Sequence, residues 1–489
     1  MNTPFPSWLS AVIPWTTGRI RGGVHPEGRK NLTADKPIVR TFPLPERLYL
    51  PLQQHIGQPA KPVVAVGDGV LKGQKLASGQ PGTITAALHA PTSGRIVDIC
   101  AHPAPHVSGL PTRTLILEPD GEDRWIETIS CDDPWQLSPE EIAERVEAAG
   151  IVGLGGAAFP SAVKLNLGRT RRIHTLILNG GECEPYLTCD DRLMRERADA
   201  IIEGVAIMRH GLEASAALVA IEDNKPEAYD AMVAAAATYQ RIDVVKVPSL
   251  YPMGWEKNLV THLTGLEIPA GGMTSDMGVL MHNVATAYAI GVAIRLGRPL
   301  VSRIVTVSGG ALDNPCNLEV PLGTPISELL AWCGHHPERT VRYVMGGPMM
   351  GDPLPRIDVP VVKKTNGILA LTADEVSATD AKPCIRCGRC VAVCPVGLLP
   401  LELMTRIRAG QLDAAMGFGL KDCISCSSCS YACPSNIPLV QYFKYAHGEL
   451  AERHRSQQKS DYTRKLIEEK QQRLERAKQR RTAKPTESA

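Results

Sequence analysis

Eight of the chain's 14 cysteines fall in two short runs with the same spacing. The first run reads CIRCGRCVAVCP at residues 384–395, and the second reads CISCSSCSYACP at residues 423–434. Thiolates separated by two residues can converge on one metal centre, and the proline behind each run prevents a helix from continuing through it. The repeated spacing therefore predicts two metal centres.

The pattern CxxCxxCxxxCP is typical of a pair of [4Fe-4S] clusters in which the fourth cysteine of each run binds the other cluster. Zinc is the alternative, but it uses separated CxxC pairs and rarely three such steps in succession. We predict one cluster on Cys384, Cys387, Cys390 and Cys433, and a second on Cys394, Cys423, Cys426 and Cys429. No metal is assigned to the scattered cysteines Cys100, Cys131, Cys183, Cys189, Cys316 and Cys333.

Length and composition narrow the class of protein. The chain has 489 residues, of which 44% are hydrophobic and 21% charged, so it can form several globular domains. A formal charge of +2 gives no field suited to nucleic acid, and 4% aromatic residues offer few surfaces for base stacking. Nucleic acid is therefore excluded as a partner.

The first residues, MNTPFPSWLSAVIPW, have no basic segment ahead of their apolar run and are interrupted by prolines, which argues against a signal peptide. No apolar stretch reaches the roughly 18 residues that a membrane helix needs. We expect a cytosolic chain with reduced thiols, touching a membrane only peripherally or through a partner. The segment from Trp8 to Trp15 is read either as a contact with a partner or membrane surface or as plain N-terminal packing.

A glycine-rich loop follows a predicted helix. Ser138 is the expected N-cap, Pro139 the first helical residue and Glu141 the partner in a capping box, so a helix runs to about Gly150. The loop GLGGAAF spans residues 153–159, and a second helix is expected from near Pro160. Such a loop leaves backbone N–H groups free to hold a phosphate, although a tight turn between helices is the competing interpretation.

Strands and helices then alternate, which is typical of a layered α/β domain. We predict strands over 173–178, 217–221 and 242–247, helices over 193–210 and 226–239, and a further helix with a polar start over 280–294. The polar, acidic segment 179–191 follows the first strand. Ligands of open α/β sheets bind at that end of a strand.

These motifs resemble the flavin and nucleotide motifs of the NADH-oxidising, FMN-binding subunit of respiratory complex I. The residues that carry the resemblance are GLGGAAFP at 153–160 with Lys164, NGGECEP at 179–185 with Asp191 and Arg192, Tyr251, Gly254, Glu256, Asn283, Val284 and Thr286. Together with the twin cysteine runs, nearly the whole chain is similar to the RnfC (RsxC) family of the Rnf (Rsx) ion-translocating electron-transport complexes.

The resemblance implies a role for each position. The FMN site would comprise Gly153, Gly155, Gly156, Ala157, Phe159, Lys164, Asn179, Asn283 and Thr286. Glu182, Glu184 and Glu256 would face the nicotinamide nucleotide as the catalytic set. Two positions depart from the complex I pattern, because Gly181 replaces an acidic residue and Trp255 replaces a glutamate. For the polar residues the competing interpretation is a solvated loop or a helix cap.

The expected fold is a multidomain α/β chain in five parts. These are an N-terminal region with a barrel-sandwich hybrid (1–130), a complex I-like α/β domain for FMN and NADH (131–300), a β-grasp (SLBB-like) domain (301–372), an α-helical ferredoxin-type domain with two [4Fe-4S] clusters (373–447) and a charged tail (448–489). The barrel-sandwich segment lacks a lipoyl-bearing hairpin, and segment 303–334 is assigned no chemistry. The tail is expected to be a solvated helix fading into disorder, with a docking element as the alternative.

The family resemblance implies a function. The chain would pass electrons between NADH/NAD+, non-covalent FMN and two [4Fe-4S] clusters, as an NADH-linked oxidoreductase or translocase subunit. Its partners would be integral and cluster-bearing subunits of an Rnf-type complex, with ferredoxin reached indirectly, at the cytoplasmic face of the bacterial inner membrane. A soluble flavin-dependent cobalamin reductase and a non-catalytic cluster conduit are the alternatives.

Overall fold

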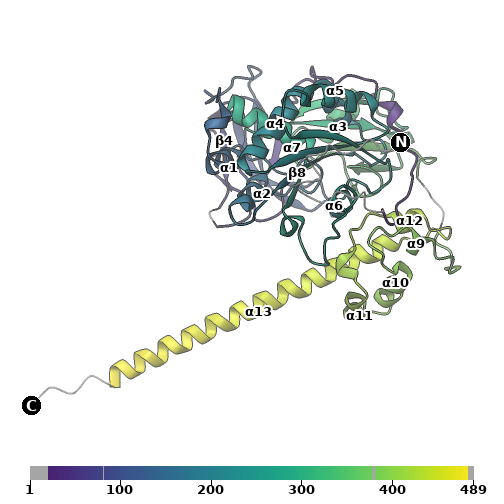
Figure 1. The fold of residues 1–489 in the computed structure, drawn as a ribbon. Coiled ribbons are helices and arrows are strands. Elements are labelled where there is room, and N and C mark those ends of the chain that lie inside the picture. The colour runs from purple at the N-terminus through teal and green to yellow at the C-terminus, as the bar shows by residue number, and fades with distance from the viewer. Residues whose placement is uncertain (1–19, 81, 377–379, 483–489) are drawn as a thin grey trace, which may run out of the picture. The chain divides into compact units, whose positions relative to one another are not determined.

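The computed structural model describes residues 20–80, 82–376 and 380–482, which fall into two compact units that divide between Asp380 and Ala381 (Figure 1). The first unit contains three sheet-based parts, and the second is helical. The predicted N-terminal contact segment from Trp8 to Trp15 lies outside the described residues.

The first part of the larger unit is built from two small sheets. One has the order β1 (Leu48–Pro51), β7 (Pro111–Pro119), β6 (Gly94–Pro103) and β3 (Gly69–Val70). The other has the order β2 (Lys61–Pro62), β4 (Lys75–Ser78) and β5 (Leu88–His89). Strand side chains from both sheets, including Leu76, Ile96 and Leu115, are fully buried between them. This is the predicted barrel-sandwich arrangement.

The second part is a parallel sheet of four strands in the order β10 (Ile242–Val247), β9 (Ala216–Glu222), β8 (Thr175–Gly180) and β11 (Val279–Asn283). The chain proceeds outward from β8 through β9 to β10 and then returns to place β11 on the other side of β8. The strand order therefore reverses between β8 and β11, which is where open α/β sheets bind their ligands.

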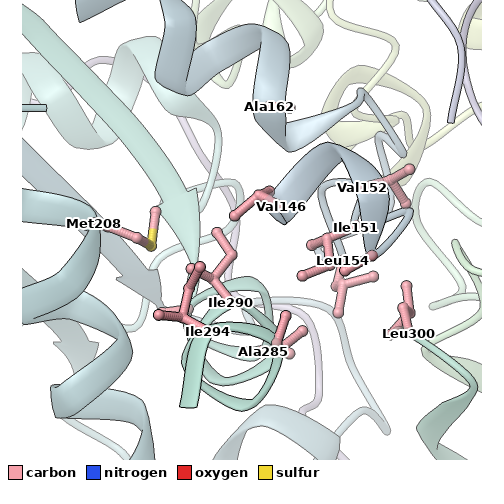
Figure 2. Packing of buried hydrophobic residues seen from close by; sticks show 14 of the residues in the cluster. Val146, Ile151, Val152, Leu154, Ala162, Met208, Ala285, Ile290, Ile294 and Leu300 are labelled. Carbon is pink, nitrogen blue, oxygen red and sulfur yellow. The ribbon is translucent and has the colours of Figure 1, made fainter. Parts of the chain in front are cut away.

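Helices cover both faces of this sheet. Leu176 and Leu178 of β8 pack into one apolar core with helices α1 (Pro139–Ala148), α4 (Ala198–Gly211), α5 (Pro226–Ala236) and α7 (Val284–Leu296). Ile177 faces the opposite side and packs with α6 (Glu256–Thr264). Figure 1 shows α4 and α7 on one side of β8 and α6 on the other. Figure 2 shows Ile151, just before the glycine loop, and Leu154, within it, in the same core as Ala285 and Ile290 of α7.

Most of the predicted elements of this domain are confirmed, including the capping box of α1 and the strand at 242–247. The single helix expected over 193–210 is wrong, because α3 (Cys189–Glu196) ends and α4 begins at Arg197, whose φ of −139° and ψ of 34° are not helical. The helix expected over 280–294 is wrong in its first residues. Val279–Asn283 pair with β8 as a strand, and a short apolar run does not distinguish the two states.

The third part is a five-stranded sheet in the order β13 (Cys316–Pro321), β12 (Ser302–Ser308), β16 (Gly367–Leu371), β14 (Arg342–Met345) and β15 (Asp352–Leu354). Helix α8 (Ile326–Trp332) packs on it through Ile326, Leu329 and Leu330, as a β-grasp fold requires. The turn between β14 and β15, residues 346–351, becomes important below.

The second unit contains the short helices α9 (Arg389–Ala392), α10 (Pro400–Arg408), α11 (Leu412–Gly417) and α12 (Ser428–Tyr431), followed by α13 (Leu439–Thr482). Leu403, Ile407 and Phe443 lie in its core. Helix α13, yellow in Figure 1, has 44 residues and continues from this core into the charged tail, so the boundary predicted at 448 lies inside a helix. Among the described residues, every helix is too short or too polar to span a lipid bilayer.

Candidate functional site

A cleft of about 550 Å³ lies in the larger unit, where the strand order reverses. Asn179 ends β8 and Asn283 ends β11, and the two residues are opposite each other in the parallel register. Asn179 Nδ2 donates to the carbonyl of Gly254 at 2.8 Å, and Asn283 Nδ2 donates to Asp190 Oδ2 at 2.6 Å. Both amides are thus fixed in the floor of the cleft. Its volume lies within the range usual for small-molecule sites.

The glycine loop forms one wall. It connects α1 to α2 (Ser161–Asn166), and the N–H groups of Gly155, Gly156 and Ala157 donate to no other described residue. Gly156 has a φ of +106°, and a Cβ on Gly155 would lie 3.2 Å from Asn283 Cβ. Glycine therefore keeps this backbone close to the cleft and its donors accessible. Three adjacent free N–H groups are suited to an anion such as a phosphate.

Two buried side chains support the same ligand chemistry. Ser161 Oγ and His282 Nε2 line the cleft and have no hydrogen-bond partner among the described residues. Burial holds the pKa of His282 well below its usual value, so the imidazole is neutral. Buried polar atoms normally have a partner, and a phosphate oxygen would provide one for each of these donors. These residues therefore fit the phosphate of FMN.

Lys164 also lines the cleft but already has protein partners. Its Nζ lies 3.0 Å from the carbonyl of Met281 and 3.5 Å from Glu256 Oε2. Glu256 accepts a further hydrogen bond from Thr274 Oγ1. Lys164, predicted for the FMN site, and Glu256, predicted for the catalytic set, are thus paired with each other.

Two lysines hold the acidic loop that follows β8 by hydrogen bonds to its backbone carbonyls. Lys30 Nζ donates to the carbonyls of Glu182, Glu184 and Leu187 at 2.9, 3.0 and 2.5 Å. Lys225 Nζ donates to the carbonyl of Gly181 at 2.6 Å. The two lysines bind the backbone carbonyls of this loop, and Glu182 and Glu184 of the same loop line the cleft.

Glu182 and Glu184 both line the cleft and both accept backbone hydrogen bonds. Glu182 accepts from the N–H groups of Asp190 and Asp191 at 2.8 and 3.2 Å, which caps the start of α3. Glu184 accepts from the N–H groups of Met349 and Met350 at 3.0 and 2.8 Å, in the β14–β15 turn. Burial nevertheless raises the pKa of Glu184 to about 7, and burial and the nearby Glu182 raise the pKa of Asp190 to about 7.

Every site residue predicted for FMN and NADH lines this cleft except Thr286. Thr286 is fully buried behind the glycine loop, where its Oγ1 accepts from the N–H of Leu154 at 2.9 Å. Several residues that line the cleft are not among those predicted from the sequence, namely Ser161, Cys183, Asp190, His282, Met345, Gly346, Gly347, Met350, Gly351, Asp352, Lys364 and Asn366. Most belong to the β-grasp domain, and no local motif signals a contact made between domains.

The structure also brings the cluster cysteines together in two groups. Cys433 joins Cys384, Cys387 and Cys390 around a pocket of about 160 Å³, although it belongs to the second run. Cys394 lies close enough to Cys423, Cys426 and Cys429 to raise their pKa values, burial being the larger cause. This grouping matches the crossed assignment. In the first group Cys384 and Cys387 are exposed, whereas Cys426 and Cys429 of the second are buried.

Four family models match the chain in the order of its parts. They are the RnfC barrel sandwich hybrid domain (residues 18–122), the Nuo51 FMN-binding domain (146–292), the SLBB domain (304–353) and the 4Fe-4S dicluster domain (383–437). The expected fold class, the presence of an FMN-binding domain and the presence of a domain with two 4Fe-4S clusters are thereby confirmed.

A relative in Rhodobacter capsulatus is 53% identical over 453 residues, covering 92% of this chain and 86% of that protein. One in Pseudomonas aeruginosa is 47% identical and covers 94% of this chain and 59% of that longer protein. Both are the C subunit of an ion-translocating oxidoreductase complex. The chain belongs to this family. Among solved structures, an NAD+-reducing [NiFe]-hydrogenase in the air-oxidized state is 19% identical with a TM-score of 0.43, covering 56% of this chain and 54% of that one.

Membership of the RnfC family fixes the general role. The chain is a subunit of an ion-translocating oxidoreductase complex, in which an FMN-binding domain and a 4Fe-4S dicluster domain serve electron transfer. Being one subunit of a complex implies other subunits as partners. The resemblance noted from the motifs is thereby confirmed.

Proposed function

We propose that the chain is the NAD(H)-facing subunit of its complex and exchanges electrons between NAD(H), FMN and two [4Fe-4S] clusters. The observation that carries the proposal is the cleft between β8 and β11. There the free N–H groups of the glycine loop face an acidic loop whose backbone Lys30 holds in place. Bound FMN would accept two electrons as hydride and release them singly, which lets a two-electron carrier serve one-electron clusters.

Each part of the cleft has a proposed task. Gly155, Gly156, Ala157, Ser161 and His282 bind the flavin phosphate. Asn179 and Asn283 orient the ring system. Glu182 and Glu184 orient the nicotinamide nucleotide from fixed positions, because backbone N–H groups restrain both carboxyl groups.

We assign one cluster to Cys384, Cys387, Cys390 and Cys433 and the other to Cys394, Cys423, Cys426 and Cys429, and we place the chain peripherally at the cytoplasmic face of the inner membrane. Integral and cluster-bearing subunits would exchange electrons with it, and ferredoxin would do so indirectly. The domain limits predicted from the sequence remain part of this proposal, apart from the limit at 448, which falls inside α13.

The test is anaerobic reconstitution of the chain with iron, sulfide and FMN, followed by addition of NADH. We expect flavin bleaching together with a cluster EPR signal. If dithionite reduces the clusters but NADH does not, the result favours a non-catalytic cluster conduit. The observation behind that alternative is that Gly181 and Trp255 depart from the complex I pattern.

A further inference from the structure

The β-grasp domain contributes an ion pair to the cleft of the α/β domain. Lys364 Nζ and Asp352 Oδ2 are 2.9 Å apart, and both residues line the cleft. Their side chains are 30% and 29% exposed, so the pair is accessible to a ligand. Neither residue belongs to the complex I-like motifs of the sequence.

The backbone around Lys364 is tied to the glycine loop. Buried Lys363 donates through Nζ to the carbonyls of Ala87 and Gly150, each at 2.6 Å. Arg303, also buried, donates to the carbonyls of Thr365 and Leu154 at 3.1 and 2.9 Å. The residues on both sides of Lys364 are therefore anchored to Gly150, just before the glycine loop, and to Leu154, within it.

Lys364 consequently lies against the phosphate-binding wall. It lines the cleft and also a neighbouring cavity of about 300 Å³, and Gly156 and Ala157 line both of these spaces as well. Two lysines, Lys164 and Lys364, are found among the described residues that line the cleft, alongside five acidic residues. Lys164 has two partners, the carbonyl of Met281 and Glu256, whereas the partly exposed ion pair with Asp352 is the one interaction found for Lys364 Nζ among the described residues. Ion pairs that remain partly accessible to water contribute little stability.

We propose that Lys364 binds a phosphate group of the nucleotide in the cleft and that Asp352 competes with the ligand for it. This inference rests on the proposed function. The phosphate could be the monoester of FMN or the diphosphate of NAD(H), and the two share the chemistry that a lysine recognises. A charged hydrogen bond from the β-grasp domain would then help to fix the ligand in the cleft.

The test compares Lys364→Gln, Lys364→Arg and Asp352→Asn in the full chain. Lys72→Gln is the matched control, because Lys72 pairs with Asp123 at 2.7 Å outside the cleft. Binding of FMN to the flavin-free chain is measured by flavin fluorescence, and binding of NAD+ to the FMN-loaded chain by calorimetry. Thermal unfolding of each variant verifies that it is folded.

We expect Lys364→Gln to weaken one of the two ligands about tenfold, whereas Asp352→Asn strengthens the same ligand by roughly twofold to fivefold. Lys364→Arg should retain most of the affinity. If FMN is the ligand whose affinity changes, Lys364 binds the monoester phosphate of FMN, and if NAD+ is, Lys364 binds the diphosphate of NAD(H). If the ion pair were purely structural, removing either partner would change the ligand affinity in the same direction. A decrease in affinity for Lys364→Gln together with an increase for Asp352→Asn therefore excludes that explanation.

The inference is overturned if Lys364→Gln binds both ligands as Lys72→Gln does, or if the glutamine and asparagine variants weaken binding alike. It fails separately from the proposed function. If the unmodified chain binds no NAD+ while Lys364→Gln loses FMN, the nucleotide proposal fails and the phosphate contact stands. If the unmodified chain binds both ligands and the variants change neither, only the phosphate contact fails.

Discussion

Glu184 connects two segments separated by 165 residues along the chain, because its carboxyl group accepts from the N–H of Met349 in the β-grasp domain. A Cβ on Gly347 would lie 2.2 Å from Glu184 Oε2, so glycine is required for this approach. Burial raises the pKa of Glu184 to about 7, which makes its charge sensitive to pH near neutrality. Below that pH the group is largely neutral, and above it the cleft gains a negative charge.

This titration predicts a pH dependence of nucleotide binding. NAD+ carries phosphate charges, so we expect its Kd to rise roughly threefold to tenfold between pH 6 and pH 8 as Glu184 ionises. In Glu184→Gln the rise should be smaller but not absent, because Asp190 also has a pKa of about 7. Calorimetric titrations at several pH values provide the measurement. Glu267→Gln, at an exposed position outside the cleft, serves as the control, and equal pH profiles for both variants would contradict the prediction.

The crossed cysteine groups predict which substitutions share a phenotype. Cys433→Ala should alter the same cluster as Cys384→Ala, whereas Cys394→Ala should alter the other one. EPR spectra and iron content would show whether the variants fall into these two classes. FMN content should stay unchanged in all three, because the cysteines and the cleft belong to different compact units. If Cys394→Ala and Cys384→Ala altered the same cluster, the crossed arrangement would be refuted.

Spacing alone identified these cysteines because their motif is local, whereas the predicted cleft residues came from the resemblance to the complex I subunit. Ser161, His282 and Lys364 could not be assigned in this way. A serine at a helix start and a histidine in an apolar run are common in cores, and the importance of Lys364 depends on anchors at Gly150 and Leu154.

At the scale of elements, the packing of α4 against α7 positions the floor of the cleft. Gly204 of α4 lies against α7, where an added Cβ would be 2.0 Å from the carbonyl oxygen of Ala287. Gly291 of α7 lies close to α4 in turn, since its Cβ would be 3.2 Å from Gly204 Cα. Helix α7 begins directly after Asn283, so its position sets that of the asparagine.

Gly204→Ala should therefore both destabilise the larger unit and lower its FMN content. Overpacking of this kind costs about 1–3 kcal/mol in the free energy of unfolding, which urea denaturation followed by circular dichroism would measure. Gly448→Ala is the control in a helix, because nothing lies within 4 Å of its added Cβ. That change should stabilise helix α13 by at most about 1 kcal/mol. If Gly204→Ala retains its full FMN content, the position of α7 does not determine the FMN site.

The elements themselves were mostly predictable, and the errors have physical causes. The capping box marks the start of α1 because Ser138 and Glu141 satisfy each other's backbone N–H groups. The end of α3 at Arg197 was missed because apolar periodicity continues through it. Strand β11 was missed because its pairing with β8 decides its conformation.

At the scale of the whole molecule, α13 extends well past the core of its unit. Leu450 is the last of its residues that packs against that core, and all described side chains from Ala451 to Gln479 are exposed. Deletion of residues 451–489 should change the unfolding free energy by less than about 0.5 kcal/mol and leave the iron and FMN contents unchanged. Loss of iron on truncation would show that the exposed part of the helix supports the cluster unit.

The order of parts along the chain was predictable because each part has its own strand pattern or cysteine spacing. That two of these parts would line the same cleft was not predictable. Side chains from the α/β and β-grasp domains line that cleft, and Lys30, which precedes both, holds one of its loops.

This distribution of the cleft along the chain has a consequence for biosynthesis. Chains emerge from the ribosome with the N-terminus first, and domains generally fold as units during synthesis. The last lining residue of the cleft, Asn366, is translated before Cys384, the first of the eight cysteines in the two runs. The flavin pocket can therefore fold before the cysteines of either run emerge from the ribosome, so flavin loading can precede cluster assembly on the nascent chain.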